Sequence, residues 1–253
     1  MQTATITALR PYASVRAAAA PRKYEVTCSN CNLRELCLAR SLSREELARI
    51  EQIVFARRRV RRGEKLFKAG DPFSALYAVR SGFLKTTVLT ADGREQVTGF
   101  HMGGELLGLD GIGGGRYHGD AVALEDCEVC VLPYALLERF GREIPAIQRN
   151  LHGVLSREIA RDQGVMMLLG SMRAEERLAA FLLNLSRRFT ARGYSSSDFH
   201  LRMTREEIGS FLGLKLETVS RLFSRFQADG TIEVEQKHVR LLDIGALERL
   251  VHS

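Results

Sequence analysis

Residues 203–230, MTREEIGSFLGLKLETVSRLFSRFQADG, decide the fold of the C-terminal part of this chain. Thr204 and Glu207 form a capping-box pattern, which predicts the start of a helix. Gly213 can make the tight turn after that helix, and a second helix is expected from about Leu216 to Asp229. Two short helices joined by a glycine-containing turn predict a helix-turn-helix, an element that binds DNA.

The second helix carries candidate base-reading residues on its exposed N-terminal face. Arg221 can donate two hydrogen bonds to guanine, Glu217 can accept one from cytosine, and Ser220 can reach a phosphate or a base edge. Glu217 and Arg221 are four residues apart, so they are also expected to brace each other as an ion pair. The alternative is a solvated helix face that contacts no nucleic acid.

Further DNA contacts are expected around this helix pair. Lys215 stands at the N-cap of the second helix, where lysine is a poor cap but suits a nearby phosphate. The segments TIEVE (231–235) and KHVRLLD (237–243) predict a β-hairpin wing with Lys237 at its tip. Thr204, Lys215 and Lys237 therefore join the candidate DNA-binding residues.

A long helix is expected from Pro145 onward. Spacings of three and four residues place a mainly apolar row along it, made of Gln148, His152, Leu155, Ile159, Asp162, Met166 and Leu169. Such a row is typical of a coiled-coil seam, and the alternative is an ordinary amphipathic helix packed on a neighbouring domain. Asp162 is the anomaly, because a carboxylate inside an apolar seam is costly unless it is paired or regulated. Leu155, Ile159, Asp162 and Met166 are the candidate dimer switch.

Residues 55–132 predict an antiparallel sandwich or barrel. Glycine-rich turn signals recur at short intervals, and between them lie the strand-like runs KLFKAG, ALYAVR, FLKTTVLT, EQVTGFH, DAVAL and CEVCVLP. Short strands with such turns are typical of small β-barrels, which often enclose a ligand. A short helix opened by Ser43 and Glu46 is expected before the barrel, and an amphipathic helix over 173–193 is expected after the long helix.

Five cysteines form two groups, Cys28-x2-Cys31-x5-Cys37 and Cys127-x2-Cys130. An odd number in a cytoplasmic chain argues against a disulfide framework. Three interpretations remain. The thiols are simply buried, or two CxxC pairs bind zinc with Cys37 left over, or about four thiolates bind an iron–sulfur cluster. Spacing alone leaves zinc and iron–sulfur nearly even.

Composition limits the class of protein. The 253 residues carry 37 Lys and Arg against 30 Asp and Glu, a net charge of +7, which favours nucleic acid as a partner. No apolar stretch approaches the ~20 residues of a membrane helix, and no secretory signal is evident, so a cytoplasmic location without membrane contact is expected. No nucleophile–base pair and no phosphate-binding glycine loop are evident, so an enzyme is not expected.

From about Tyr24 to Val251 the chain resembles the CRP/FNR family of bacterial transcription regulators, and within it the oxygen-sensing FNR branch. The resemblance rests on CSNCNLRELC in the cysteine segment, on LFKAGDPFSALYAVRSG and EQVTGFHMGGELLGLDGIGGG in the barrel, on AEERLAAFLLNLSRRF, and on ETVSRLFSRFQADG. It implies an α+β fold with an N-terminal antiparallel β-barrel (a double-stranded β-helix like that of cyclic-nucleotide-binding domains), a long dimerisation helix and a C-terminal winged helix-turn-helix domain. The expected boundaries are a disordered N-terminus over 1–24, the cysteine loop and barrel sensor over 25–144, the dimerisation helix over 145–172 and the DNA-binding domain over 173–253.

The resemblance also implies a cofactor and its ligands. The family's fourth ligand lies in a late strand just before a proline, a position that Cys130 occupies in CEVCVLP. A [4Fe–4S] cluster held by Cys28, Cys31, Cys37 and Cys130 is therefore implied, with Cys127 as a spare. Relatives that bind cyclic AMP carry Arg-Ser or Arg-Thr where this chain has Arg116-Tyr117, so a cyclic nucleotide is not expected.

The function that the resemblance implies is an oxygen-responsive global regulator of anaerobic gene expression, acting as activator or repressor. With its cluster it would bind, as a homodimer, a palindromic site like TTGAT-N4-ATCAA in double-stranded DNA, and it would release the DNA when oxygen degrades the cluster. RNA polymerase would contact exposed loops of the barrel. The alternatives are a cyclic-nucleotide-type regulator or a zinc or thiol-redox regulator of the same fold.

Overall fold

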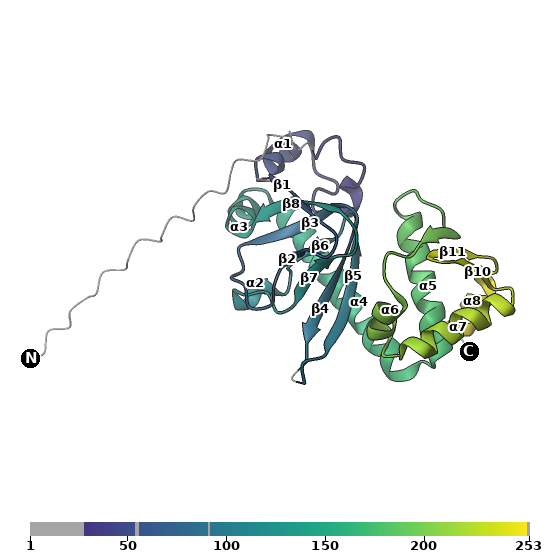
Figure 1. Cartoon of the computed structure of the whole chain (residues 1–253). Coiled ribbons are helices and arrows are strands. Elements are labelled where there is room, and N and C mark those ends of the chain that lie inside the picture. The colour runs from purple at the N-terminus through teal and green to yellow at the C-terminus, as the bar shows by residue number, and fades with distance from the viewer. Residues whose placement is uncertain (1–27, 54–55, 91, 252–253) are drawn as a thin grey trace, which may run out of the picture.

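The computed structural model describes residues 28–53, 56–90 and 92–251. Figure 1 shows two lobes joined by a long helix: a β-barrel with helices around it, and a smaller lobe that contains α5 to α8. Antiparallel sheets, a long helix and a C-terminal helix-turn-helix confirm the predicted α+β fold class. The predicted disordered N-terminus, residues 1–24, lies outside the described residues.

Two four-stranded antiparallel sheets form the barrel. Their strand orders are β1-β8-β3-β6 and β2-β7-β4-β5. The strands are β1 Ala56–Val60, β2 Lys65–Phe67, β3 Ala75–Ser81, β4 Phe83–Leu89, β5 Glu95–Met102, β6 Leu106–Leu107, β7 Asp120–Ala123 and β8 Cys127–Pro133. Inward side chains from both sheets, such as Leu84, Leu107 and Val129, meet in one fully buried core. Period-two alternation in short strands therefore produces the barrel, as the sequence predicts.

Three elements of the barrel are not evident in the sequence. Strand β1 reads ARRRV, and its run of arginines hides the alternation, yet it pairs with β8 from Ala56 opposite Val131 to Val60 opposite Cys127. Strand β6 has only two residues. The glycine cluster expected to be a turn forms the one-turn helix α2, Gly111–Gly114, before Gly115 adopts a positive φ.

The cysteine loop, residues 28–42, covers one end of the barrel. It contains a short 3-10 helix, Arg34–Leu36, and leads into α1, Arg44–Ile53. The predicted capping box of α1 is confirmed, because the Glu46 N–H donates to Ser43 Oγ (3.2 Å) and the Ser43 N–H donates to Glu46 Oε2 (2.8 Å).

Helices α3, Tyr134–Glu143, and α4, Pro145–Ser171, follow the barrel. Leu137 of α3 and Ile147 of α4 are fully buried in the same apolar cluster as Leu38 and Ile50 of the cysteine loop and α1. The loop is thus anchored in a buried apolar cluster that it shares with α1, α3, α4 and the barrel strands.

The C-terminal lobe combines four helices and a small sheet. The helices are α5 Ala174–Thr190, α6 Arg205–Leu212, α7 Leu216–Ala228 and α8 Ile244–Val251. The predicted wing is confirmed as the antiparallel pair β10, Ile232–Glu235, and β11, His238–Leu241, and the sequence does not indicate its third strand β9, Asp198–His200. None of the helices in the described part of the chain is both long and apolar enough to cross a membrane.

The two lobes are packed together along strand β5. The Val97 N–H donates to Ser210 Oγ of α6 at 2.8 Å, and the side-chain amide of Gln96 donates to the Ser210 carbonyl oxygen. Phe100 and Phe211 meet with ring centroids 5.4 Å apart. One apolar cluster therefore continues from the barrel edge into the C-terminal lobe.

Candidate metal centre and nucleic-acid interface

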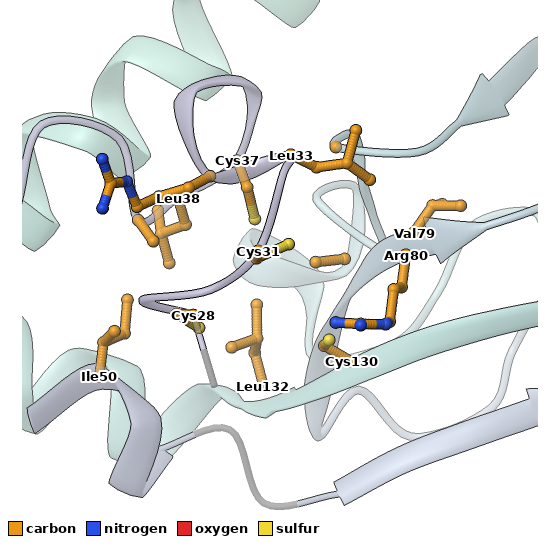
Figure 2. A pocket seen from close by; sticks show the side chains of 14 residues that line it. Cys28, Cys31, Leu33, Cys37, Leu38, Ile50, Val79, Arg80, Cys130 and Leu132 are labelled. Atoms are coloured by element: carbon orange, nitrogen blue, oxygen red, sulfur yellow. The ribbon is translucent and has the colours of Figure 1, made fainter. Parts of the chain in front are cut away.

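Four cysteines from two distant segments line one cavity at the loop end of the barrel. Cys28, Cys31 and Cys37 come from the cysteine loop and Cys130 comes from β8, and Figure 2 shows the four side chains around one hollow. All four are free thiols. Apart from two arginines, the remaining lining is apolar and includes Leu33, Leu38, Ile50, Val79 and Leu132.

Tight backbone turns bring the three loop cysteines to this cavity. The Cys31 N–H donates to the Cys28 carbonyl oxygen, and the Cys37 N–H donates to the Arg34 carbonyl oxygen, both at 3.2 Å. Leu38, next to Cys37, is only 1% exposed and anchors the end of the loop in the core. The Arg34 N–H also donates to the Cys31 carbonyl oxygen at 3.1 Å, so three successive turns lead from Cys28 to Cys37.

The loop rests on the turn between β5 and β6, where two glycines leave room for it. A Cβ on Gly103 would lie 2.8 Å from Leu33 Cδ1, and a Cβ on Gly104 would lie 2.7 Å from Leu36 Cβ. Gly104 also has φ +90°, which favours glycine. This turn therefore sets how closely the cysteine loop approaches the barrel.

Cys127 is not part of this site. It is three residues from Cys130 on the same strand, and an odd separation in a strand places two side chains on opposite faces. Its thiol is buried in the barrel core and donates to the Phe83 carbonyl oxygen at 3.2 Å. A zinc site built from two CxxC pairs would need both cysteines of β8 on one ion, so the geometry does not support that interpretation.

Burial keeps several of these thiols protonated at neutral pH. Desolvation, with smaller contributions from neighbouring thiols, raises the pKa of Cys28 to about 12 and that of Cys130 to about 11. Desolvation also raises the pKa of Cys37. Cys37 contributes to the raised pKa of both Cys28 and Cys130, so these three thiols share one electrostatic environment.

The grouping does not fit a single metal ion. Within residues 28–53, 56–90 and 92–251, no three His, Cys, Asp or Glu side chains are placed to hold one metal ion. A structural zinc requires thiolates about 2.3 Å from one centre.

The interior of the barrel is occupied by its own side chains. Tyr117 is 3% exposed, stacks on Phe67 with centroids 4.0 Å apart, and donates its hydroxyl to the Ala75 carbonyl oxygen at 2.7 Å. Arg116, the neighbour of Tyr117, is turned to the Gly70 carbonyl oxygen at 2.6 Å. Arg116 and Tyr117 therefore both make contacts within the barrel.

The helix-turn-helix forms as the sequence predicts. Thr204 Oγ1 accepts from the Glu207 N–H at 3.1 Å and Glu207 Oε2 accepts from the Thr204 N–H at 2.7 Å, so the capping box is confirmed. Gly213 ends α6 with φ +63°. A Cβ on Gly209 would meet the Leu214 carbonyl oxygen at 2.6 Å, so this glycine permits the turn to fold back on α6.

The candidate base-reading residues share one exposed surface. Lys215, Glu217, Ser220 and Arg221 are exposed along the first half of α7, while Val219, Phe223 and Phe226 are buried on its other face. Lys237 is exposed in the turn of the wing, where its ammonium donates to the Arg202 carbonyl oxygen at 3.4 Å.

One expectation for α7 is wrong. Glu217 and Arg221 form no ion pair in the described structure, although they are four residues apart. Both side chains are exposed, and an exposed pair gains too little to hold two long side chains in one geometry. Both groups therefore stay available to a partner.

Sequence reasoning also misses Arg205, at the start of α6. Its guanidinium lies over the Phe223 ring, 3.1 Å from the centroid, and its Nη1 is buried without a hydrogen-bond partner in the described residues. Desolvation lowers its pKa to about 10. Ser220 and Ser224 line the same surface hollow as Arg205, so a cationic side chain borders a polar recess beside the exposed face of α7. The signal in the sequence is the position of Arg205 in TREE (204–207), directly after the N-cap residue Thr204.

The predicted seam of α4 is partly exposed in the single chain, with Leu155 and Leu169 half-buried. Ile159 is 59% exposed and Met166 is 64% exposed, and Asp162 lies between them on the surface. Arg161 pairs with Glu158 at 2.8 Å, and both residues line a hollow between α4 and the barrel that Asp162 also borders. Because only the N-terminal part of α4 is firmly packed on the barrel core, an ordinary packed helix does not account for the exposed row.

Two families match successive parts of the chain. The cyclic nucleotide-binding domain matches residues 57–143, and the Crp-like helix-turn-helix domain matches residues 176–250. The first match covers the barrel and α3, and the second begins in α5 and ends in α8.

Curated and solved relatives span most of the chain. It is 48% identical over 216 residues to the transcriptional activator protein anr of Pseudomonas aeruginosa, which covers 85% of this chain and 88% of that protein. It is 42% identical over 225 residues to the fumarate and nitrate reduction regulatory protein of Escherichia coli K12, with 89% and 90% covered. The structure of FixK2 from Bradyrhizobium japonicum superposes with a TM-score of 0.72 at 30% identity and covers 77% of this chain and 96% of that one. The two curated relatives are named as regulators, in agreement with the expectation of a non-enzyme.

Proposed function

The chain belongs to the CRP/FNR family of transcription regulators, in its FNR-type branch, and from this premise we propose that it is an oxygen-responsive regulator in which Cys28, Cys31, Cys37 and Cys130 hold a [4Fe–4S] cluster. One observation carries the proposal: these four cysteines, drawn from segments about ninety residues apart, line one cavity, while the fifth cysteine faces away from it.

The donor set supports this cofactor. A [4Fe–4S] cluster takes one thiolate at each of four irons, so its ligands stand further apart than the ligands of a single zinc ion. The apolar lining, which includes Leu33 and Leu132, limits the access of water and oxidant to such a group. When bound, the cluster would make the protein sensitive to oxygen, because oxygen degrades the cluster.

The four thiols must lose protons to bind iron. Burial holds the pKa of Cys28 and Cys130 far above neutral pH, so iron has to displace the protons. Arg80, which lines the cavity, stabilises a Cys130 thiolate electrostatically. The loop that carries three of these cysteines is already packed against the protein core through Leu38, without any metal.

The exposed row on α4 supports a homodimer. Leu155, Ile159 and Met166 lie along one side of the helix and would be covered by the same helix of a second copy. Asp162 interrupts the row, so two carboxylates would meet across a two-fold axis and weaken the pair. The free energies of the monomer and the dimer are then nearly equal, and a cluster bound near the N-terminal end of α4 can shift the equilibrium to the dimer.

A dimer would present two α7 helices to adjacent major grooves, about 34 Å apart. Arg221 and Glu217 would read a G·C pair, with Ser220 beside them, in a site like TTGAT-N4-ATCAA. Thr204, Arg205, Lys215 and Lys237 would contact phosphates around these bases. RNA polymerase would contact exposed barrel loops, and the regulator would act in the cytoplasm.

A cyclic nucleotide is not the proposed signal. Tyr117 is buried in the barrel core and Arg116 is committed to a backbone carbonyl oxygen, so the pair that would hold a cyclic phosphate is not assembled.

The test is to purify the protein without oxygen and to measure its visible spectrum, iron, sulfide and zinc. About four irons and four sulfides per chain, lost in air together with binding to the palindromic site, are expected. Zinc in place of iron, or DNA binding that is the same with and without oxygen, would refute the proposal.

A further inference from the structure

The turn beneath the cysteine loop is also held by the C-terminal lobe. Glu105 follows Gly103 and Gly104, the two glycines that touch Leu33 and Leu36 of the loop. Its carboxylate accepts from Arg192 Nη2 at 2.6 Å and from Arg188 Nη2 at 2.7 Å. Arg188 lies in the last turn of α5, the first helix of the lobe that reads DNA, and Arg192 lies just beyond the end of this helix.

The clamp extends beyond the carboxylate. Arg192 Nε donates to the Gly103 carbonyl oxygen at 2.6 Å, and Arg188 Nη2 donates to the Phe100 carbonyl oxygen at 2.6 Å. The Arg192 side chain is only 6% exposed and that of Arg188 is 18% exposed. Because these ion pairs are shielded from solvent and reinforced by backbone contacts, they hold α5 to the turn more firmly than a surface pair does.

The same turn is tied to the cysteine cavity on its other side. The Gly104 N–H donates to the Val79 carbonyl oxygen at 2.8 Å, and the Val79 N–H donates to the Glu105 carbonyl oxygen at 2.9 Å. Val79 and Gly104 both line the cavity of the four cysteines, as does Leu33 of the loop. A shift of the loop would therefore change the packing against residues 103–105.

We propose that Glu105 is a positioning residue for DNA binding, which couples the seating of the cysteine loop to the placement of the DNA-binding lobe through Arg188 and Arg192. This inference rests on the proposed function for its biological meaning, but its contacts exist in the iron-free chain. It adds a route within one subunit to the proposed route through the dimer helix. Loosening of the loop releases the turn, and release of the turn frees the end of α5.

The first experiment uses the full chain without iron and combines Leu36→Ala, which loosens the loop over Gly104, with Glu105→Gln, which removes the charge that holds the arginines. Hydrogen exchange of the backbone amides at the end of α5, residues 186–190, is the measurement. Leu36→Ala is expected to raise these exchange rates about tenfold in the parent chain and less than about twofold in the Glu105→Gln background.

A matched control separates coupling from simple loss of an ion pair. Glu125 of the barrel pairs with Arg202 of the C-terminal lobe at 3.1 Å, so it also joins the two lobes, but its carboxylate is not bonded to Arg188 or Arg192. In a Glu125→Gln background, Leu36→Ala is expected to keep its full effect on α5. Equal effects of Leu36→Ala in the parent and Glu105→Gln chains would overturn the proposal.

The second experiment uses protein loaded with iron and sulfide without oxygen. Glu105→Gln is expected to retain the iron, the sulfide and the sedimentation coefficient of the parent chain and to bind the palindromic site about tenfold more weakly. If the parent chain takes up no cluster, the proposed function fails while the first experiment still decides the coupling. Unchanged DNA affinity in a loaded Glu105→Gln dimer would show that Glu105 does not position the lobe.

Discussion

Cys127 and Cys130 lie three residues apart on strand β8 and face opposite sides of its sheet: Cys127 packs in the barrel core, and Cys130 faces the cavity of the loop cysteines. A CxxC sequence usually suggests a pair of metal ligands, but that interpretation assumes a turn. In an extended strand the same spacing separates the two thiols.

This relationship predicts different results for two serine variants. Cys130→Ser should give a protein that holds little iron and binds DNA weakly, because a cluster has lost one of four ligands. Cys127→Ser should keep its iron and its DNA binding, since a serine hydroxyl can replace the thiol that donates to Phe83. The visible spectrum and iron content of both variants, prepared without oxygen, give the answer. An iron-free Cys127→Ser protein beside a brown Cys130→Ser protein would reverse the assignment.

Arg221→Ala should lower the affinity for the palindromic site by about 1–3 kcal/mol and relax the preference at one G·C pair. Its side chain is exposed and unpaired with Glu217, so the variant changes no internal contact of α7. Lys237→Ala is the matched control, because loss of a phosphate contact should weaken binding to all sequences alike and reduce its salt dependence. Competition with sites altered at the G·C pair distinguishes the two. Full discrimination by Arg221→Ala would exclude it as a reading residue.

Arg205→Gln should weaken binding to every DNA sequence by a similar factor and lower the salt dependence by about one counterion. The glutamine keeps an aliphatic stem but removes the cation that lies over Phe223 and borders the recess of Ser220 and Ser224. Arg225→Gln is a suitable comparison, since Arg225 is committed to Glu175 at 2.6 Å. Thermal unfolding of the free proteins corrects for lost packing. An affinity change confined to one base pair would contradict a phosphate role.

Asp162→Ala should give a dimer that binds DNA in air and without iron. Two carboxylates about 4–5 Å apart repel by about 3–4 kcal/mol at an effective dielectric near 20, and the variant removes this term from an otherwise apolar row. Gln163→Ala changes the neighbouring exposed position and should leave the iron-free chain monomeric. Sedimentation at micromolar concentration is the measurement. A monomeric Asp162→Ala protein would instead favour a salt bridge from Arg157 across the seam, because Arg161 is paired with Glu158.

Gly104→Ala should destabilise the chain by more than Gly93→Ala does. Both glycines have positive φ, so each alanine carries a backbone cost of about 1 kcal/mol. A Cβ on Gly93 meets nothing within 4 Å, whereas a Cβ on Gly104 lies 2.7 Å from Leu36 Cβ and displaces the cysteine loop. Denaturant unfolding of the iron-free proteins gives the difference. Equal losses of unfolding free energy in the two variants would mean that the cysteine loop does not pack against Gly104.

Local signals in the sequence predict the helices and most of the barrel. The capping boxes at Ser43 and Thr204 each use residues three apart, and glycines with positive φ such as Gly213 end their elements where the sequence places them. Strand β1 is the exception, because Arg57, Arg58 and Arg59 obscure which face is inside, and only its partner β8 reveals it.

Long-range contacts explain what the sequence does not predict. The resemblance to a family brings Cys130 to the loop cysteines, but no local pattern shows that Glu105 meets Arg188, 83 residues later. The expected Glu217–Arg221 ion pair does not form for the opposite reason: its spacing is correct, but water solvates both charged groups. A recess such as that of Arg205 emerges only when α6 and α7 are packed together.

The hydrogen bond from Val97 to Ser210 has a consequence for solubility. Strand β5 is the last strand of its sheet, and an unpaired strand edge is a template on which another chain can add. Helix α6 covers part of this edge and takes up one of its N–H groups. A DNA-binding lobe that swung fully away would bare the edge and invite aggregation. Protection of the edge therefore limits the range of motion open to a switch in this chain, and it favours small rotations of the lobe over complete undocking.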